Sequence, residues 1–376
     1  MAGRVTMAQV ARAAGVSVST VSRVLGDRPD ISEETRHRVA RAAEETGYAA
    51  RRGRGQQRGG LLDVLIEGFT TAWAGELIAG AQAAAFSQGF TLAVTATSHP
   101  RFRISDWVET RRARPPEGVI LVLSRARHDE ITALASLPAP LILLDPVGTS
   151  DPTIPTVGTT NWSGGAAATR HLLELGHRRV GFIGGSPEMS CTRERHEGYL
   201  AAHREFSLDP DPALTRYGNF LVTGGAEHGA ALLDLADPPT AVFAGSDGQA
   251  AGVYQAARAR GLRIPVDLSV VGFDDTVLCA MLAPPLTTVR QPLAEMATEG
   301  VRLIAQEHAR SGSTAGRRVE LATSLVVRQS TAPPTGGAGG EPAGNEPAGN
   351  EPAGNEPAGN EPAGNETGRN TKRRAS

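Results

Sequence analysis

The chain has 376 residues, of which 40% are hydrophobic and 21% are charged, and its formal net charge is −2. This composition is typical of a globular protein of several domains, and no apolar run is long enough to span a bilayer. No signal peptide opens the chain and Cys191 and Cys279 are its only cysteines, so we expect a cytoplasmic protein with free thiols and no cysteine-built zinc site.

Residues 1–48 predict three short helices, the first two arranged as a helix-turn-helix. Thr6 and Ser17 are residue types that cap helices, and Gly15 can end the first helix in a left-handed conformation. The second helix turns Val21 inward and leaves a small polar surface outside, which suits the major groove of DNA. The residues expected at that interface are Thr6, Ser17, Val18, Ser19, Thr20, Ser22 and Arg23.

The charge of this region supports contact with phosphates. The first 60 residues hold eleven arginines against six acidic residues, although the whole chain is slightly acidic. Arg23 is expected to read a base, because a guanidinium can bond guanine O6 and N7 together; a phosphate contact is the alternative. The hydroxyls of Ser17, Thr20 and Ser22 suit phosphates, and helix capping is their other possible role.

This head resembles the DNA-binding head of the lactose-repressor (LacI/GalR) family. The matching stretches are Met7-Ala8-Gln9-Val10-Ala11, Ala14-Gly15-Val16-Ser17, Thr20-Val21-Ser22-Arg23-Val24-Leu25 and Gly47-Tyr48. The resemblance implies a near-palindromic double-stranded operator as partner and a homodimer, with a tetramer left open.

Residues 49–60 are predicted to be a hinge linker. Family members commonly carry a leucine there that wedges into the minor groove, but this linker has no leucine, and Gly53 and Gly55 disfavour a helix. Arg51, Arg52, Arg54 and Arg58 are therefore expected to lie along phosphates or in a narrow minor groove. A plain flexible tether is an equally good interpretation.

Residues 61–330 alternate strands and helices twice, which predicts two doubly wound parallel sheets. Lobe 1 is expected at about 61–159 and 291–318, and lobe 2 at about 160–290 and 319–330. Expected strands include 61–66, 90–96, 118–123, 141–144, 179–183, 241–244, 268–273 and a final one near 319–327; expected helices include 73–88, 161–175, 192–206, 247–260 and 293–308.

This core also resembles the same family. The matching stretches include Asn161-Trp162, Arg195-His196-Glu197-Gly198-Tyr199, Ser269-Val270-Val271-Gly272-Phe273-Asp274-Asp275 and Leu286-Thr287-Thr288-Val289-Arg290-Gln291-Pro292. The resemblance implies a core like periplasmic sugar-binding proteins, with a small effector between the lobes. It places Arg195 and Asp274 at effector-contacting positions.

Other residues of the core are candidates for the same effector site. A buried arginine and carboxylate suit a sugar, although a structural ion pair is the alternative for Arg195 and Asp274. Asp145 and Ser246 each follow a strand at the carboxyl edge where open α/β sheets bind ligands. Trp73 and Phe220 are candidates for stacking on a sugar, or else are core aromatics.

Residues 331–376 are expected to be a disordered tail, because five Glu-Pro-Ala-Gly-Asn repeats cannot build a core. The whole sequence predicts a transcriptional regulator, expected to be a repressor, whose operator affinity is controlled by a sugar or oligosaccharide. No cofactor, metal site, catalytic residue or membrane partner is expected. A solute-binding transport protein and an α/β enzyme are the alternatives; the head argues against the first and the missing phosphate loop against the second.

Overall fold

The head folds as a helix-turn-helix followed by a third helix. The computed structural model describes residues 6–25, 31–46, 60–122, 127–146, 151–309 and 314–335. Helices α1 (Met7–Ala14), α2 (Val18–Leu25) and α3 (Glu33–Thr46) pack around Val10, Val21 and Val39, whose side chains are fully buried. Their apolar sides meet one another, so the polar side of α2 is left outside.

The caps of the first two helices explain where the chain turns. Gly15 ends α1 with φ +64°, a conformation that glycine adopts without steric cost. Ser17 Oγ accepts a hydrogen bond from Thr20 N at 3.1 Å, as the sequence predicts for the start of α2. At the start of α1 the backbone of Thr6 is the donor instead, because Thr6 N donates to the side-chain oxygen Oε1 of Gln9 at 2.7 Å.

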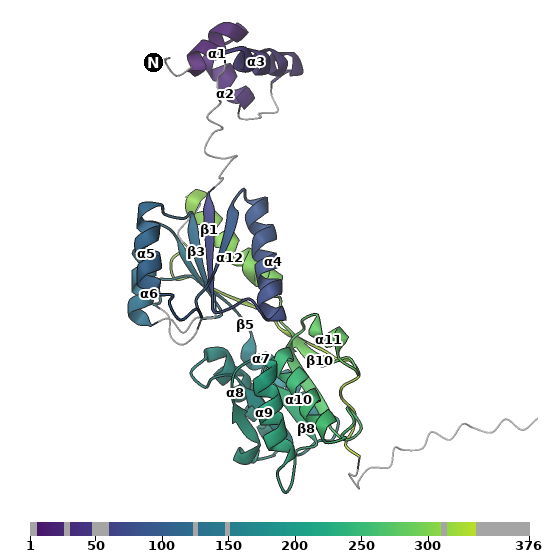
Figure 1. Cartoon of the computed structure of the whole chain (residues 1–376). Coiled ribbons are helices and arrows are strands. Elements are labelled where there is room, and N and C mark those ends of the chain that lie inside the picture. The colour runs from purple at the N-terminus through teal and green to yellow at the C-terminus, as the bar shows by residue number, and fades with distance from the viewer. Residues whose placement is uncertain are drawn as a thin grey trace, which may run out of the picture. The chain divides into compact units, whose positions relative to one another are not determined.

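The first lobe is a parallel sheet covered by helices on both faces (Figure 1). Helices α4 (Ala72–Ser87) and α12 (Leu293–Ala309) share one apolar core with the sheet, and α5 (Ile104–Ala113) and α6 (His128–Ala135) share the other. The strand order is β11 (Arg318–Leu321), β5 (Thr156–Thr159), β4 (Leu141–Leu144), β3 (Gly118–Val122), β1 (Leu61–Ile66) and β2 (Thr91–Ala96).

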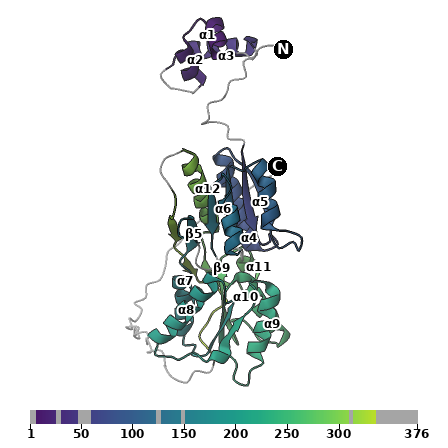
Figure 2. The same cartoon turned by 90° about the vertical axis from the view of Figure 1, so that its left-hand side faces the viewer.

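The second lobe repeats this plan (Figure 2). Helices α7 (Asn161–Glu174) and α8 (Ser190–Glu205) cover one face, and α9 (Val222–Leu233) and α10 (Asp247–Ala259) cover the other. The strand order is β12 (Ser324–Val326), β10 (Thr287–Arg290), β9 (Ser269–Asp274), β8 (Ala241–Ala244), β6 (Val180–Gly184) and β7 (Thr215–Tyr217), with only β12 antiparallel to its neighbour among the described strands.

The chain passes between the lobes at three places, which differ in part from the prediction. It crosses from β5 to α7, from β10 to α12, and from β11 to β12. The strand expected near residues 319–327 is two strands, because β11 pairs with β5 in the first sheet and β12 with β10 in the second. The last crossing is therefore at Ala322 and Thr323, later than the expected boundary at 318.

The chain stays attached to the second lobe beyond the expected start of the tail. Ala332 N donates a hydrogen bond to Ser269 Oγ at 3.0 Å, and Ala332 O lies 3.0 Å from His177 Nε2. Thr331 Oγ1 is 2.9 Å from His171 Nε2. The expected boundary at residue 331 is therefore too early, and the Glu-Pro-Ala-Gly-Asn repeats lie outside the described residues. No described helix combines the length and the apolarity that crossing a membrane requires.

Candidate functional site

Polar side chains gather where strands of the two lobes end. Asp145 directly follows β4 of the first lobe, and Asp274 is the last residue of β9 in the second. Both have positive φ, +48° and +121°, so the backbone turns as each strand ends. Arg195 of α8 and Asn161, the first residue of α7, lie between them in charge or hydrogen-bond contact. All four side chains are at least nine-tenths buried.

Arg195 is the centre of this cluster. Its Nε donates to Asn161 Oδ1 at 2.9 Å, and its Nη1 donates to the carbonyl oxygen of Gly245 at 2.5 Å. The guanidinium carbon lies 3.8 Å from the centroid of Phe273 and 5.5 Å from that of Phe220. Ring faces attract a cation, and the flat guanidinium packs well on them, so the rings hold the buried charge in one orientation.

The carboxyl groups around Arg195 have raised pKa values, which disfavour their ionised form. Burial raises the pKa of Asp145, and Arg195 and Asn161 oppose the rise. Burial and the charge of Asp247 raise the pKa of Asp274 well above its usual range, and Arg195 and Gln291 oppose it. Glu194, next to Arg195, also has a raised pKa, through burial and the charge of Asp145. One guanidinium thus serves several carboxyls, which favours a ligand rich in hydroxyl groups over an anion.

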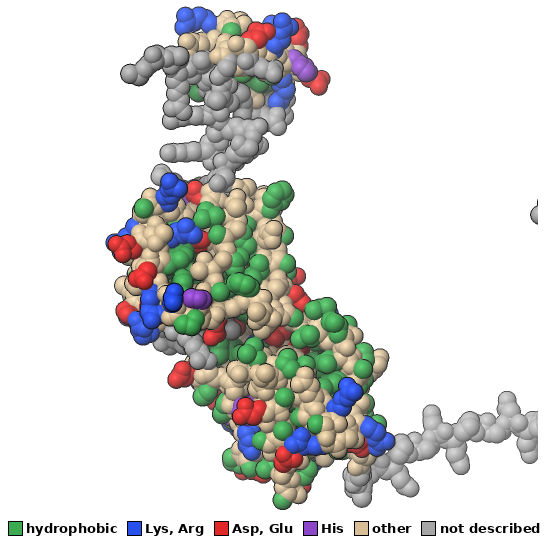
Figure 3. All heavy atoms as spheres, in the orientation of Figure 1, with side chains coloured by type: hydrophobic (Ala, Val, Ile, Leu, Met, Phe, Trp, Pro, Cys, Tyr) green, Lys and Arg blue, Asp and Glu red, His purple; other side chains and the backbone are tan. Residues whose placement is uncertain are grey.

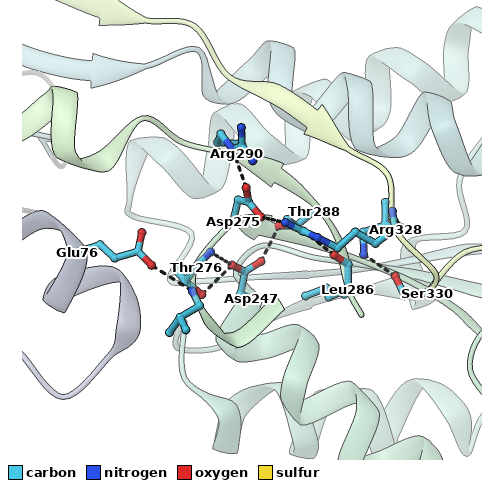
Figure 4. Close-up of polar contacts among 11 residues, drawn as sticks. Glu76, Asp247, Asp275, Thr276, Leu286, Thr288, Arg290, Arg328 and Ser330 are labelled. Carbon is cyan, nitrogen blue, oxygen red and sulfur yellow. Dashed lines mark hydrogen bonds and ion pairs between the residues drawn. The ribbon is translucent and has the colours of Figure 1, made fainter. Parts of the chain in front are cut away.

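The turn after Asp274 is held by a network of polar contacts (Figure 4). Asp247 Oδ2 accepts from Thr276 N at 2.7 Å and from Thr276 Oγ1 at 3.0 Å, and its Oδ1 accepts from Thr288 Oγ1 at 2.6 Å. Burial nevertheless raises the pKa of Asp247 to about 6. Gln291 Nε2 donates to Asp274 Oδ1 at 2.6 Å, and Gln291 Oε1 accepts from Thr159 Oγ1 at 2.8 Å, which joins the site to the first lobe.

The remaining predicted effector residues occupy different places. Ser246 caps α10: its Oγ accepts from Gln249 N and donates to the carbonyl oxygen of Phe220. Phe220 lies beside Arg195 by its ring. Trp73, near the start of α4, packs against the core of the first lobe, and no described contact joins it to Arg195, Asp145 or Asp274. The structure therefore brings five of the six predicted effector residues together, while Trp73 packs against the apolar core of the first lobe.

Several residues of the site were not singled out from the sequence. Asn161 and Gln291 lie at two of the crossings between lobes. The hydrophobic periodicity of the sequence does not reveal single amide side chains of this kind. The sequence places Asp247 beside Ser246 at the carboxyl edge of a sheet, but only Ser246 is among the expected effector residues. Within the described residues, Thr192 Oγ1 and Gln249 Oε1 are buried without a hydrogen-bond partner. Buried oxygens of this kind are rare and mark places where a polar ligand or water can bind.

The head presents the predicted DNA-contacting surface on α2. Val18, Ser19, Ser22 and Arg23 are exposed, and Val18 is 46% exposed although it is apolar. Ser17 Oγ lies 2.7 Å from Ser19 Oγ and 2.8 Å from Thr20 Oγ1, so the hydroxyls form one polar cluster at the start of the helix. Thr6 is exposed at the start of α1. Arg51, Arg52 and Arg54 lie outside the described residues.

Comparison with known proteins identifies the family of this two-part arrangement. Residues 6–50 match the model of bacterial regulatory proteins of the lacI family, and residues 169–331 match a periplasmic binding protein-like domain. The HTH-type transcriptional regulator DegA of Bacillus subtilis (strain 168) is 32% identical over 338 residues, covering 88% of this chain and 99% of DegA. The chain belongs to the lacI family. It is a DNA-binding transcriptional regulator with a helix-turn-helix head.

Further relatives agree with this lacI-family assignment. The HTH-type transcriptional repressor CytR of Escherichia coli (strain K12) is 32% identical, covering 87% of this chain and 96% of CytR. Among solved structures, a complex of the transcriptional regulator CelR with cellobiose has 30% identity and a TM-score of 0.67, covering 87% of this chain and all of that one. A lac repressor dimer bound to operator and an anti-inducer has 26% identity and a TM-score of 0.67, covering 88% and 100%.

Proposed function

We propose that this protein is a homodimeric repressor that releases or binds its operator in response to a neutral, polyhydroxylated effector such as a sugar. The observation that carries the proposal is the buried cluster of Arg195, Asp145 and Asp274 at the ends of strands from both lobes. A ligand that contacts both lobes favours one relative arrangement of them, and only such differential affinity can shift DNA binding.

The chemistry of the cluster supports a hydroxyl-rich ligand. Carboxyl groups accept hydrogen bonds from hydroxyls when ionised, and they also donate when protonated, which raised pKa values favour for Asp145 and Asp274. The Phe220 ring beside Arg195 offers an apolar face of the kind that sugar rings stack on. The similarity to the CelR structure with cellobiose, and to a regulator from Enterococcus faecium with bound ribose at 26% identity, points in the same direction.

Exposed apolar side chains support the homodimer. Phe86 of α4 is 83% exposed, Met281 of α11 (Leu278–Met281) is 73% exposed, and Val277 just before α11 is 60% exposed. Figure 3 shows hydrophobic side chains gathered over the faces of α4 and α11. Large apolar patches on a protein surface mark interaction sites, and a second copy of the chain would cover them in a two-fold arrangement. Two heads in such a dimer suit a near-palindromic operator.

A calorimetric titration with cellobiose, ribose and related sugars, paired with a gel shift on the region upstream of its own gene, tests the proposal. We expect one sugar to bind once per subunit and to change operator binding. Arg195→Ala and Asp274→Ala should abolish both the sugar binding and the response while retaining operator binding. Glu109→Ala, which removes an exposed carboxyl from α5, is the control and should behave as wild type.

Two outcomes would contradict it in different ways. If a sugar binds wild type and both site variants with equal affinity, the effector site lies elsewhere in the molecule. If no sugar binds and none alters the gel shift, the saccharide effector is wrong, while the DNA-binding assignment is unaffected.

A further inference from the structure

The turn that presents Asp274 has an unusual backbone. Asp274 has φ +121° and Asp275 has φ +62°, so two consecutive residues with side chains lie in the region that favours glycine. Conformations of this kind are strained, and they persist only where surrounding contacts enforce them. The position of the Asp274 carboxyl thus depends on whatever holds the turn.

Asp275 is the residue by which the turn is held most firmly. Arg290 Nε lies 2.6 Å from Asp275 Oδ2, and Arg328 Nη2 lies 2.6 Å from Asp275 Oδ1. The Asp275 side chain is only 5% exposed, so these ion pairs are weakly screened on its side. Figure 4 shows the two arginines reaching Asp275 from β10 and from the segment after β12.

Arg328 is itself fixed at several points. Its Nη1 donates to the carbonyl oxygen of Leu286 at 2.8 Å, and its backbone N donates to Thr287 Oγ1 at 2.9 Å. The next residues stay attached as well, because Ser330 Oγ donates to the carbonyl oxygen of Val270 at 2.6 Å and accepts from Thr287 N at 2.7 Å. These hydrogen bonds therefore fix the position of the Arg328 guanidinium independently of its ion pair with Asp275.

The following two residues of the turn are held by other elements. Thr276 is bound by Asp247 of α10, as described above, and Val277 N donates to Glu76 Oε1 of α4 at 3.1 Å. Every residue from Asp274 to Val277 thus has a polar partner outside the turn. Asp275 differs from the others in forming two ion pairs, one with each arginine.

We infer that Arg290 and Arg328 are positioning residues for the effector, acting through Asp275 to hold Asp274 where the ligand meets it. The inference rests on the proposed function of Asp274. A contribution to overall stability alone explains the arrangement poorly. The Arg290 side chain is 56% exposed, so solvent screens its charge, and burying the Asp275 carboxyl costs desolvation that offsets the Coulomb attraction. The two ion pairs instead fix the position of the turn that carries Asp274. Contacts behind a ligand-binding group hold that group in place in the same way in well-ordered sites.

The test compares Arg328→Gln and Arg290→Gln with Ser330→Ala in the full-length protein. Ser330→Ala removes two hydrogen bonds from the same C-terminal segment but leaves Asp275 and its partners in place. It therefore controls for loss of stability without loss of the ion pairs. Hydrogen exchange of the peptide covering residues 272–278 is the first readout, since it needs no ligand, and the melting temperature and titration with cellobiose and ribose are the others.

We expect both arginine variants to exchange faster at residues 274–277 than Ser330→Ala does at equal melting temperature, with unchanged exchange in β6 and β8. Their affinity for whichever sugar binds should fall about tenfold, while that of Ser330→Ala stays within a factor of two or so. Arg328→Lys, which keeps the charge, should recover part of the affinity.

Unchanged exchange at residues 274–277 in both arginine variants would overturn the inference, whether or not a sugar is found. Faster exchange with unaltered sugar affinity would also overturn it, because the turn would then loosen without consequence for the ligand. If neither sugar binds wild type, the proposed saccharide effector fails, and the exchange of the turn still decides whether the arginines hold it.

Discussion

The guanidinium carbon of Arg195 lies 3.8 Å from the centroid of the Phe273 ring, which directly precedes Asp274 in β9. The same short stretch of strand thus supplies the ring that supports the cation and a carboxyl whose pKa burial raises, a rise that the cation partly opposes. A shift of β9 relative to α8 would alter the two contacts together. The proposed effector site and the packing of the second lobe therefore share this pair.

The pH dependence of stability should reveal the buried Asp247. Burial raises its folded-state pKa to about 6, above the ordinary value of 3.8. The folded state therefore holds the proton more tightly, and the resulting stabilisation is complete below about pH 4 and is lost as the pH rises through about 6. We expect the free energy of unfolding of wild type, minus that of Asp247→Asn, to fall between about pH 4 and about pH 7 and to level off above.

Urea unfolding of both proteins at each pH measures this difference. Subtracting the variant removes the contributions of Asp145 and Glu194, whose pKa values are also raised but which both proteins share. Asp274 stays part of the difference, because the charge of Asp247 is one cause of its raised pKa. A difference that stays constant across the range would show that Asp247 remains ionised in the folded state. The three hydrogen bonds from Thr276 and Thr288 would then outweigh the cost of burying its charge.

Close helix packing beneath the site should make Gly165 intolerant of a side chain. A Cβ at Gly165 would lie 2.3 Å from the carbonyl oxygen of Arg195, so α7 and α8 would have to separate. We expect Gly165→Ala to lower the free energy of unfolding by about 1–3 kcal/mol, as overpacked cores do. Because the displaced backbone belongs to Arg195, sugar affinity should fall as well.

Gly75→Ala is the matched control for that substitution. Gly75 is also inside a helix, α4, but a Cβ there would meet nothing within 4 Å. It should stabilise the protein by about 0.5–1 kcal/mol, because alanine loses less backbone freedom than glycine on folding. Equal stability of the two variants would mean that α7 and α8 can move apart without cost.

The exposed face of α2 predicts how Arg23 contributes to operator binding. Arg23→Ala should cost about 1–3 kcal/mol on the operator and relax specificity at one base pair in each half-site. Arg38→Ala removes the same charge from an exposed position of α3 and should weaken operator and random DNA alike. Binding isotherms on both DNAs separate the two effects, and a loss for Arg23→Ala that is equal on both would reduce Arg23 to a phosphate contact.

The sequence predicts the two lobes well because strands and helices alternate twice with clear apolar runs. Asp145 could be found since it follows such a run at the carboxyl edge of a sheet, whereas Asp274 was indicated by the family resemblance. The last crossing was misplaced, because residues 319–327 form one apolar-rich stretch and nothing local marks the change of sheet at Ala322 and Thr323. Asn161 and Gln291 join the site only through contacts distant in sequence, which periodicity does not reveal.

Two truncations should separate the attached C-terminal segment from the repeats that follow it. Removing residues 336–376 should leave the melting temperature and operator affinity nearly unchanged, since those repeats are too poor in apolar residues to build a core. Removing residues 328–376 also deletes the hydrogen bonds of Arg328, Ser330 and Ala332 with the second lobe. Each such bond contributes about 0.5–1.5 kcal/mol, so we expect the melting temperature to fall by several degrees.

The longer deletion should also weaken the sugar response, because it removes the Arg328 partner of Asp275. Calorimetry of both truncated proteins against full-length chain provides the comparison. Equal melting temperatures for the two truncations would show that the bonds to Ser269, Val270 and His177 add nothing to stability. A drop already present in the shorter deletion would instead place a stabilising contact beyond Thr335, within residues 336–376.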